Sequence, residues 1–242
     1  MRTLVLAAFL ACSAALSAQV TVLNGASFRA DQPVTAGSWA AAFGAFTGLS
    51  QTVATQSPIP KSLAAVTVSV NGVAAPVYFV SATQINFLVP FATAPGLRDV
   101  EIKTPTATLT GRVRVMSAAP GIFANPNGGA VLNQDGALNT AATPARRGQV
   151  IQIFATGPGA LSRAIEDGAP APSSPLATTV STPDVFIGGV PAKVEFSGMA
   201  PGFSGLWQIN VTVPSQSFLT GRLPLQLYAD GVDSNEVTIH IQ

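Results

Sequence analysis

The acidic residues and one histidine are the side chains of this sequence that could perform catalysis. A serine or cysteine nucleophile needs a histidine beside it, yet the only one, His240, stands two residues from the end of the chain. Zinc sites usually draw on several cysteine and histidine ligands, which this sequence does not supply. Paired carboxylates can hydrolyse glycosides without histidine, and Asp99 and Glu101 lie two apart on an expected strand, where they would share a face.

The remaining acidic residues fit turns better than catalysis. Glu166 and Asp167 precede a glycine, and the segment from Asp230 to Glu236 lacks the full EF-hand pattern of a calcium loop. We therefore predict no catalytic, cofactor-binding or metal-binding residue, and no enzyme. A hydrolase remains a third hypothesis, which requires two carboxyl groups about 5–9.5 Å apart in one cleft.

Aromatic residues could instead hold a ligand by stacking against sugar rings. Tyr78 alternates with Val77 and Phe79 along an expected strand and is predicted to face outward. Trp39 stands near a strand start, and the sequence does not decide whether its side chain faces the core or solvent. Trp207 is in phase with the apolar residues of its strand and is predicted to be buried. Trp39 and Tyr78 are therefore the two candidate ligand contacts.

Two pairs of amide side chains occupy matching places in the sequence. Gln84 and Asn86 return as Gln208 and Asn210, on the polar phase of both strands. Such amides could bind sugar hydroxyls or neighbouring loops. Their presence in both copies favours a structural role, because each copy must fold and only one needs to bind.

An internal repeat organises the chain. The segment Asn71–Val77 returns as Gly188–Val194, and Gln84-Ile-Asn86 with Pro90 returns as Gln208-Ile-Asn210 with Pro214. The spacing between copies grows only in segments rich in glycine, proline and serine, where loops accept insertions. The sequence therefore predicts two homologous units.

Each unit shows the pattern of short, half-buried strands. Polar and apolar residues alternate over 84–89, 207–213 and 237–242. Asn71-Gly72 and Gly188-Gly189 each separate two apolar runs, as in two-residue hairpins. About seven strands per unit, at a spacing of about 8–12 residues, predict an antiparallel sandwich of immunoglobulin type.

The composition agrees with an all-β fold and limits the partners. Among 242 residues, 48% are hydrophobic and 10% charged, with 22 glycines and 19 prolines, a balance suited to short strands joined by many turns. The net charge of +1 provides no basic surface for nucleic acid. No segment after the N-terminus is apolar over 18 residues, so we expect no transmembrane span.

The N-terminus has the anatomy of a secretory signal peptide: a positive start, a short apolar stretch and a run of small residues. A lipid anchor at Cys12, the only cysteine, is the alternative to full secretion. We expect a signal peptide over residues 1–18, a first immunoglobulin-like sandwich over 19–116 and a second over 117–242. Without Cys12 no disulfide could form, so each core must be stable alone.

Several longer motifs resemble a known family. They are Asn24-Gly-Ala-Ser-Phe28, Ser117-Ala-Ala-Pro-Gly-Ile-Phe123, Gly129-Ala-Val-Leu-Asn-Gln-Asp-Gly136, Ala155-Thr-Gly-Pro-Gly159 and Gly198-Met-Ala-Pro-Gly-Phe-Ser-Gly-Leu-Trp-Gln-Ile-Asn210. Together they resemble the uncharacterised C-terminal domain family of secreted acidobacterial proteins and, more loosely, the IPT/TIG branch of immunoglobulin-like domains. The resemblance covers nearly the whole mature chain and implies an immunoglobulin-like fold and export. It assigns no catalytic residue.

The sequence thus favours a secreted, non-enzymatic tandem protein that acts in adhesion, in surface assembly or as a scaffold for protein interactions. The alternative is a carbohydrate-binding module, which predicts exposed aromatic residues on a flat patch or groove. The expected partner is an extracellular protein or a polysaccharide whose identity the sequence does not give. No cofactor is expected.

Overall fold

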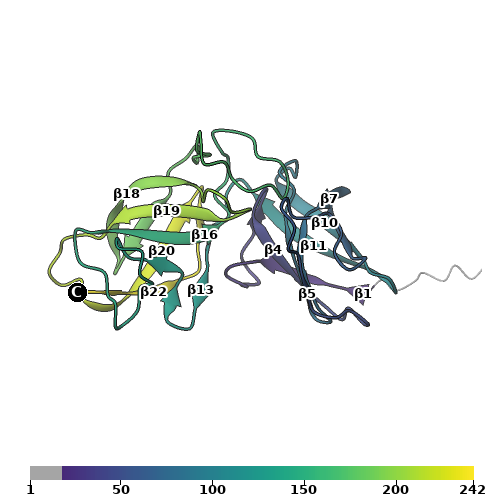
Figure 1. The fold of residues 1–242 in the computed structure, drawn as a ribbon, viewed down its shortest axis with the longest axis horizontal. Helices are drawn as coiled ribbons and strands as arrows, with labels where there is room; N and C mark the ends of the chain where they lie inside the picture. The colour runs from purple at the N-terminus through teal and green to yellow at the C-terminus, as the bar shows by residue number, and fades with distance from the viewer. Residues whose placement is uncertain (1–17) are drawn as a thin grey trace, which may run out of the picture.

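The chain forms two β-rich lobes that lie side by side (Figure 1). A computed structural model describes residues 18–242, and these residues contain strands and no helix. This part of the chain accordingly has no helix able to cross a membrane. The expected signal peptide, with Cys12, lies outside the described residues except for Ala18, which begins the first strand.

The first lobe comprises β1 (Ala18–Gln19), β2 (Thr21–Asn24), β3 (Val34–Thr35), β4 (Trp39–Phe43), β5 (Thr52–Val53), β6 (Thr67–Val70), β7 (Val73–Ala75), β8 (Val77–Val80), β9 (Gln84–Leu88), β10 (Gly96–Lys103) and β11 (Thr108–Met116). The second lobe comprises β12 (Gly121–Ile122), β13 (Ala124–Asn125), β14 (Gly128–Gly129), β15 (Val131–Leu132), β16 (Val150–Thr156), β17 (Asp184–Ile187), β18 (Val190–Met199), β19 (Trp207–Thr212), β20 (Gly221–Ala229), β21 (Val232–Asp233) and β22 (Val237–Ile241).

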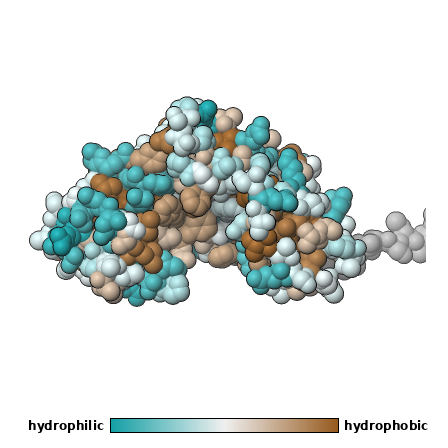
Figure 2. All heavy atoms as spheres, in the orientation of Figure 1, coloured by the Kyte–Doolittle hydropathy of each residue, from teal (hydrophilic) through white to brown (hydrophobic). Residues whose placement is uncertain are grey.

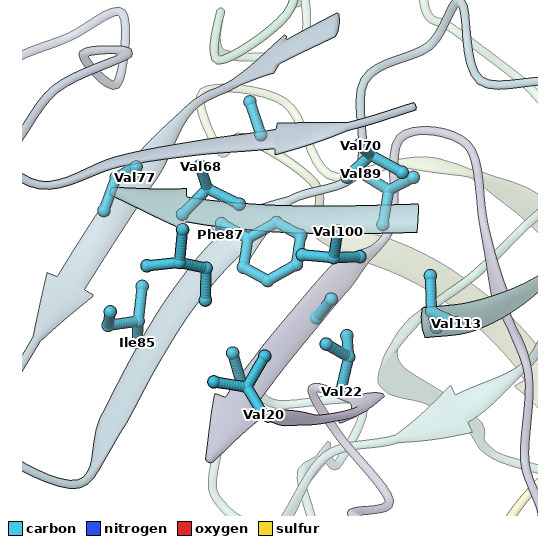
Figure 3. Packing of buried hydrophobic residues seen from close by; sticks show 14 of the residues in the cluster. Val20, Val22, Val68, Val70, Val77, Ile85, Phe87, Val89, Val100 and Val113 are labelled. Carbon is cyan, nitrogen blue, oxygen red and sulfur yellow. The ribbon is translucent and has the colours of Figure 1, made fainter. Parts of the chain in front are cut away.

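Two separate sheets form the first lobe. One has the order β1-β11-β10-β6-β7 with β3 also on β11, and the other has the order β2-β4-β9-β8-β5. Their facing sides enclose a core of mainly valine and alanine side chains drawn from Val20 to Val115. Figure 3 shows Val68, Phe87 and Val100 reaching into this shared interior from different strands. Among residues 18–242 no charged side chain is buried, as expected for an interior that depends on apolar burial.

The layers of the second lobe are joined through one long strand. The order is β12-β16-β19-β18-β17-β20-β21, with β15 on β16 and β22 on β20. The first residues of β18 pair with β17 and its later residues pair with β19, so β18 belongs to both layers. The core of the second lobe draws on residues from Ile122 to Ile241 and contains Trp207, which is fully buried as predicted. The predicted all-β, immunoglobulin-like sandwich fold is confirmed.

The repeated turns behave as their residues require. Asn71 and Gly72 connect β6 to β7 with φ of +49° and +80°, and Gly188 and Gly189 connect β17 to β18 with φ of +58° and +77°. Positive φ at both central residues is the geometry of the tight hairpin. The strands predicted over 84–89, 207–213 and 237–242 are β9, β19 and β22.

The loop over residues 157–183 spans from the second lobe to the first, at the top of the view in Figure 1. It is irregular, as predicted, and its Leu161, Ile165, Ala171 and Ala177 form a small apolar cluster with Met199 of β18. Its Gly168 carbonyl accepts a hydrogen bond from the Ile59 amide at 2.9 Å. Its Asp167 carboxylate accepts one from the Phe91 amide at 2.8 Å. These bonds fix the two lobes to each other.

Candidate functional site

The structure brings the two candidate ligand contacts together. Trp39 begins β4 and Tyr78 lies on β8, two strands that are separated in the sheet by β9. Their ring centroids are 5.3 Å apart with an interplanar angle of 66°, a favourable edge-to-face contact. Tyr78 is 39% exposed, while Trp39 is half-buried. The pair therefore offers one aromatic surface to solvent.

A β-bulge places Tyr78 on the outside of the sheet. Val77 pairs with Phe87, but Phe79 pairs with Asn86, so that Tyr78 is the extra residue. A bulge of this kind redirects one side chain and restores the alternation beyond it. Tyr78 faces outward as predicted. Phe79, which simple alternation would turn inward, lies on the outer face as well.

Tyr78 belongs to a larger outer surface of the sheet β2-β4-β9-β8-β5. Directly paired residues of an antiparallel sheet point to the same side, and one such row crosses all five strands: Leu23, Ala41, Asn86, Phe79 and Val53. Alternate residues of β2, β4 and β9 point the other way, into the core. This row is thus an outward-facing, mostly apolar band.

We call this surface the aromatic face. Phe43 shares the phase of Trp39 on β4, and the ring of Phe28 meets that of Phe43 at 6.0 Å between centroids. Its residues are Leu23, Phe28, Trp39, Phe43, Val53, Tyr78, Phe79, Gln84 and Asn86. None of them carries a charge. Phe28 and Val53 are 48% and 42% exposed, so apolar side chains of this face are open to solvent.

The predicted amide pairs form the same internal hydrogen bond in both lobes. Gln84 Nε2 donates to Asn86 Oδ1 at 2.7 Å, and Gln208 Nε2 donates to Asn210 Oδ1 at 2.9 Å. This shared bond supports the structural role that the repeat favours. In the first lobe, however, Asn86 also lines a cleft with Trp39 and Tyr78. Its Nδ2 donates to no acceptor among residues 18–242.

The cleft beside the aromatic pair lies at the junction of the lobes. It has a volume of about 160 Å³, and Phe123 from the connecting segment completes its wall. The amide of Trp39 donates to Thr156 Oγ1 of the second lobe at 2.9 Å. Figure 2 shows hydrophobic residues in the hollow between the lobes. The second lobe therefore forms one boundary of the site.

Gly205 shows how closely the second lobe approaches Trp39. Its φ is +66°, and a Cβ placed there would lie 2.9 Å from Trp39 Nε1 and 2.3 Å from Leu88 Cδ2. Only glycine fits both the conformation and the space. Three further hydrogen bonds join the lobes nearby, from Asn24 Nδ2 to the Ala119 carbonyl and from Gln32 Nε2 to the carbonyls of Pro120 and Asp233.

The candidate acids lie apart from this site. Asp99 forms an exposed ion pair with Arg112 and Glu101 forms one with Lys103, each at 3.0 Å. Asp167 accepts the junction hydrogen bond described above, and His240 is half-buried on β22. In the described part of the chain, no three His, Cys, Asp or Glu residues are grouped so that they could hold a metal ion.

Sequence reasoning named Trp39 and Tyr78 as ligand contacts and considered the amides Gln84 and Asn86, but it missed the other apolar residues of the aromatic face. Phe43 could have been found, because it lies four residues after Trp39 on the same strand, where alternation places both side chains on one side. Phe79 and Phe123 could not, because one depends on the bulge and the other on how the connecting segment folds back.

No family model matches the chain, and no curated protein sequence matches it. Solved structures with a similar arrangement include SGBP-B of the Bacteroides ovatus mixed-linkage glucan utilization locus, in complex with a mixed-linkage heptasaccharide. That similarity has 12% identity and a TM-score of 0.37, over 86% of this chain and 42% of the other. Domains 5–6 of the S-layer protein SbsC show 15% identity and a TM-score of 0.27, over 93% and 96% of the two chains.

The Yersinia pseudotuberculosis adhesin InvE is similar at 14% identity with a TM-score of 0.22, over 87% of this chain and 56% of the other. The chain thus spans less than half of the first of these proteins and a little over half of the adhesin. Their functions are their own, so the function of this chain must be argued from its residues.

Proposed function

We propose that this chain is a secreted, non-enzymatic binding protein that acts in adhesion or surface assembly through the aromatic face of its first lobe. The observation that carries the proposal is the Trp39–Tyr78 ring pair, held at the lobe junction and open to solvent. The leader-like N-terminus and the resemblance to a secreted family support export.

The physical argument is that this face is costly to leave uncovered. Phe28, Val53 and Tyr78 are exposed together on one side of one sheet, and contiguous apolar surface of this kind usually marks an interaction site. Rigid aromatic side chains lose little conformational entropy on binding. Because the face carries no charge, we expect its affinity to change little between low and moderate salt.

Carbohydrate recognition is the second candidate, and the position of Asn86 favours it. Sugar-binding surfaces combine a ring that stacks on the sugar with polar groups that bind its hydroxyls. Asn86 lines the cleft beside Trp39 and Tyr78 and has an unused Nδ2 donor. A protein partner would need no such combination.

One binding experiment tests the proposal and separates its two forms. The chain without residues 1–18 is sedimented with insoluble glucan, xylan, chitin and peptidoglycan, and with bacterial envelopes before and after protease treatment. Tyr78→Ala is compared with Tyr228→Ala, a matched control because Tyr228 is 41% exposed on the second lobe.

We expect binding to fall at least tenfold in Tyr78→Ala and to persist in Tyr228→Ala. Binding to a purified polysaccharide that survives protease treatment of envelopes would establish carbohydrate recognition, whereas protease-sensitive binding would establish a protein partner. Equal binding by both variants, or no binding to any surface, would refute a role for the aromatic face.

A further inference from the structure

A second cavity lies at the lobe junction and shares no lining residue with the aromatic cleft. Its volume is about 470 Å³, within the range of about 300–1,000 Å³ that is typical of small-ligand pockets. The first lobe contributes Thr35, Ala36, Phe91, Thr93, Pro95 and Met116, and the second contributes Gly159 to Leu161 and Arg163 to Ile165 of the long loop. The cavity therefore exists only when the lobes are docked.

Thr93 supplies an unused hydrogen-bonding group in the wall of this cavity. The residue is 6% exposed, and its Oγ1 has no hydrogen-bond partner among residues 18–242. A buried hydroxyl without a partner is uncommon and calls for an explanation. The hydroxyl oxygen is itself buried in this structure, so it reaches an occupant of the cavity after a rotation about χ1 that exchanges it with the methyl group of similar size.

Arg163 supplies the only charge among the lining residues. Its Nη1 donates to the Pro175 carbonyl at 2.7 Å, which anchors one side of the guanidinium. Its other N–H groups make no hydrogen bond in the described part of the chain. A guanidinium presents a planar set of donors that matches a carboxylate. The remaining wall is largely apolar, with Phe91 and Met116 from the first lobe facing loop residues such as Leu161.

We propose that this cavity binds a small monocarboxylate with an apolar body. The carboxylate pairs with Arg163, the Thr93 hydroxyl donates to one of its oxygens, and the apolar body packs against Phe91 and Met116. The ligand contacts both lobes, and its site adjoins the Phe91–Asp167 hydrogen bond that joins them. Occupancy therefore stabilises the docked arrangement. This site is independent of the aromatic face and of the function proposed for it.

Octanoate is a suitable probe, with 1-octanol as a control of the same length and no charge. The chain without residues 1–18 is titrated by calorimetry and by NMR with methyl-labelled methionine. Met116 lines the cavity, whereas Met199 does not line it and lies in the cluster behind the wall residues Leu161 and Ile165. We expect saturable binding of octanoate that shifts the Met116 methyl signal more than that of Met199, and at least tenfold weaker binding of octanol.

Variants separate a specific site from general attraction of an anion. Arg163→Gln is expected to remove the preference for octanoate over octanol, and Thr93→Val, which keeps the side-chain shape, to weaken octanoate several-fold. Arg146→Gln is the matched control, because Arg146 is exposed elsewhere on the second lobe. Absence of saturable binding, a larger effect of Arg146→Gln than of Arg163→Gln, or an unshifted Met116 signal would overturn the proposal.

Discussion

The two lobes share a bulge at the same place in the repeat but present different side chains there. In the first lobe the extra residue is Tyr78, next to the Phe79–Asn86 pair. In the second lobe the register shifts in the same way before the Phe196–Asn210 pair, and the extra residue is Glu195. The backbone geometry therefore belongs to the repeat, whereas the chemistry of the outward side chain belongs to each copy.

The partners of the bulge residue differ accordingly. The place of Trp39, which pairs with Leu88, is taken in the second lobe by Val150, which pairs with Thr212. Glu195 accepts a hydrogen bond from the Thr212 hydroxyl at 2.7 Å and pairs with Lys193 at 3.0 Å. The second copy thus satisfies its bulge residue internally. The first copy has an exposed ring pair instead, so the proposed binding face belongs to one copy only.

Pro76 and Lys193 explain a second difference between the lobes. They occupy matching positions in the repeat, one residue after β7 and within β18. Proline cannot donate to a strand ladder, so β7 and β8 are separate strands of separate sheets. Lys193 allows β18 to continue from one layer to the other. The two layers of the sandwich are therefore separate in the first lobe and joined through one strand in the second, at this matching position, which we call the corner.

The largest expected effect comes from truncating a large buried side chain in the core of either lobe. Trp207 and Phe87 are fully buried, but their places in the other copy are taken by Thr83 and Val211, so each core has its own large side chain. Trp207→Ala and Phe87→Ala should each lower the free energy of unfolding by about 3–5 kcal/mol. Urea unfolding measures this loss. In Trp207→Ala the fluorescence of Trp39 reports on the lobe junction, because Trp39 bonds to Thr156 of the second lobe. A loss below about 1 kcal/mol in either variant would contradict the core assignments.

A substitution at the lobe junction should have the next largest effect. Gly157 has a φ of +84°, and a Cβ there would lie 1.9 Å from the Ala119 carbonyl oxygen. Gly157→Ala should cost about 3 kcal/mol, because strain in the left-handed region is added to a backbone clash. Gly189→Ala is the control: its φ is +77° with nothing within 4 Å of the added Cβ, so it should cost about 1 kcal/mol. Equal losses of unfolding free energy in Gly157→Ala and Gly189→Ala would show that the backbone at the junction shifts to accommodate the added methyl group.

The sequence was sufficient for the elements with regular alternation and insufficient for the contacts between them. The period-two pattern identified β9, β19 and β22 and placed Trp207 inside, because strand periodicity fixes which face a residue takes. Tyr78 was assigned outward correctly, but Phe79 was not identified as part of the site, since a bulge leaves no unambiguous mark in the alternation. The contact of Trp39 with Tyr78 depends on β9 lying between their strands, which local sequence does not reveal.

Exchanging the corner residue tests the difference between open and joined layers. Lys193→Pro places in the second lobe the residue that the first lobe has at Pro76. We expect a loss of only about 1 kcal/mol in urea unfolding, the net worth of about one hydrogen bond. Val211→Pro is the contrasting variant, because Val211 is paired on both sides of β19, and it should cost about 3 kcal/mol or more. If Lys193→Pro were as damaging as Val211→Pro, the corner would not be equivalent in the two copies.

The smallest effect concerns the charge that replaces the ring at the bulge. The hydrogen bond from Thr212, followed by that from Lys193, holds the pKa of Glu195 below its usual value of 4.5. A carboxyl pKa that is lowered by folding adds stability above the unfolded value, and this contribution is lost as the pH falls through the folded value. The free energy of unfolding of Glu195→Gln should therefore fall less than that of the parent chain as the pH drops below about 4.5. Thr212→Val should raise the Glu195 pKa in a carbon-detected NMR titration, because it removes the largest cause of the shift. An unchanged titration would mean that the hydroxyl does not stabilise this carboxylate, and the contrast between an internally satisfied bulge and an exposed one would fail.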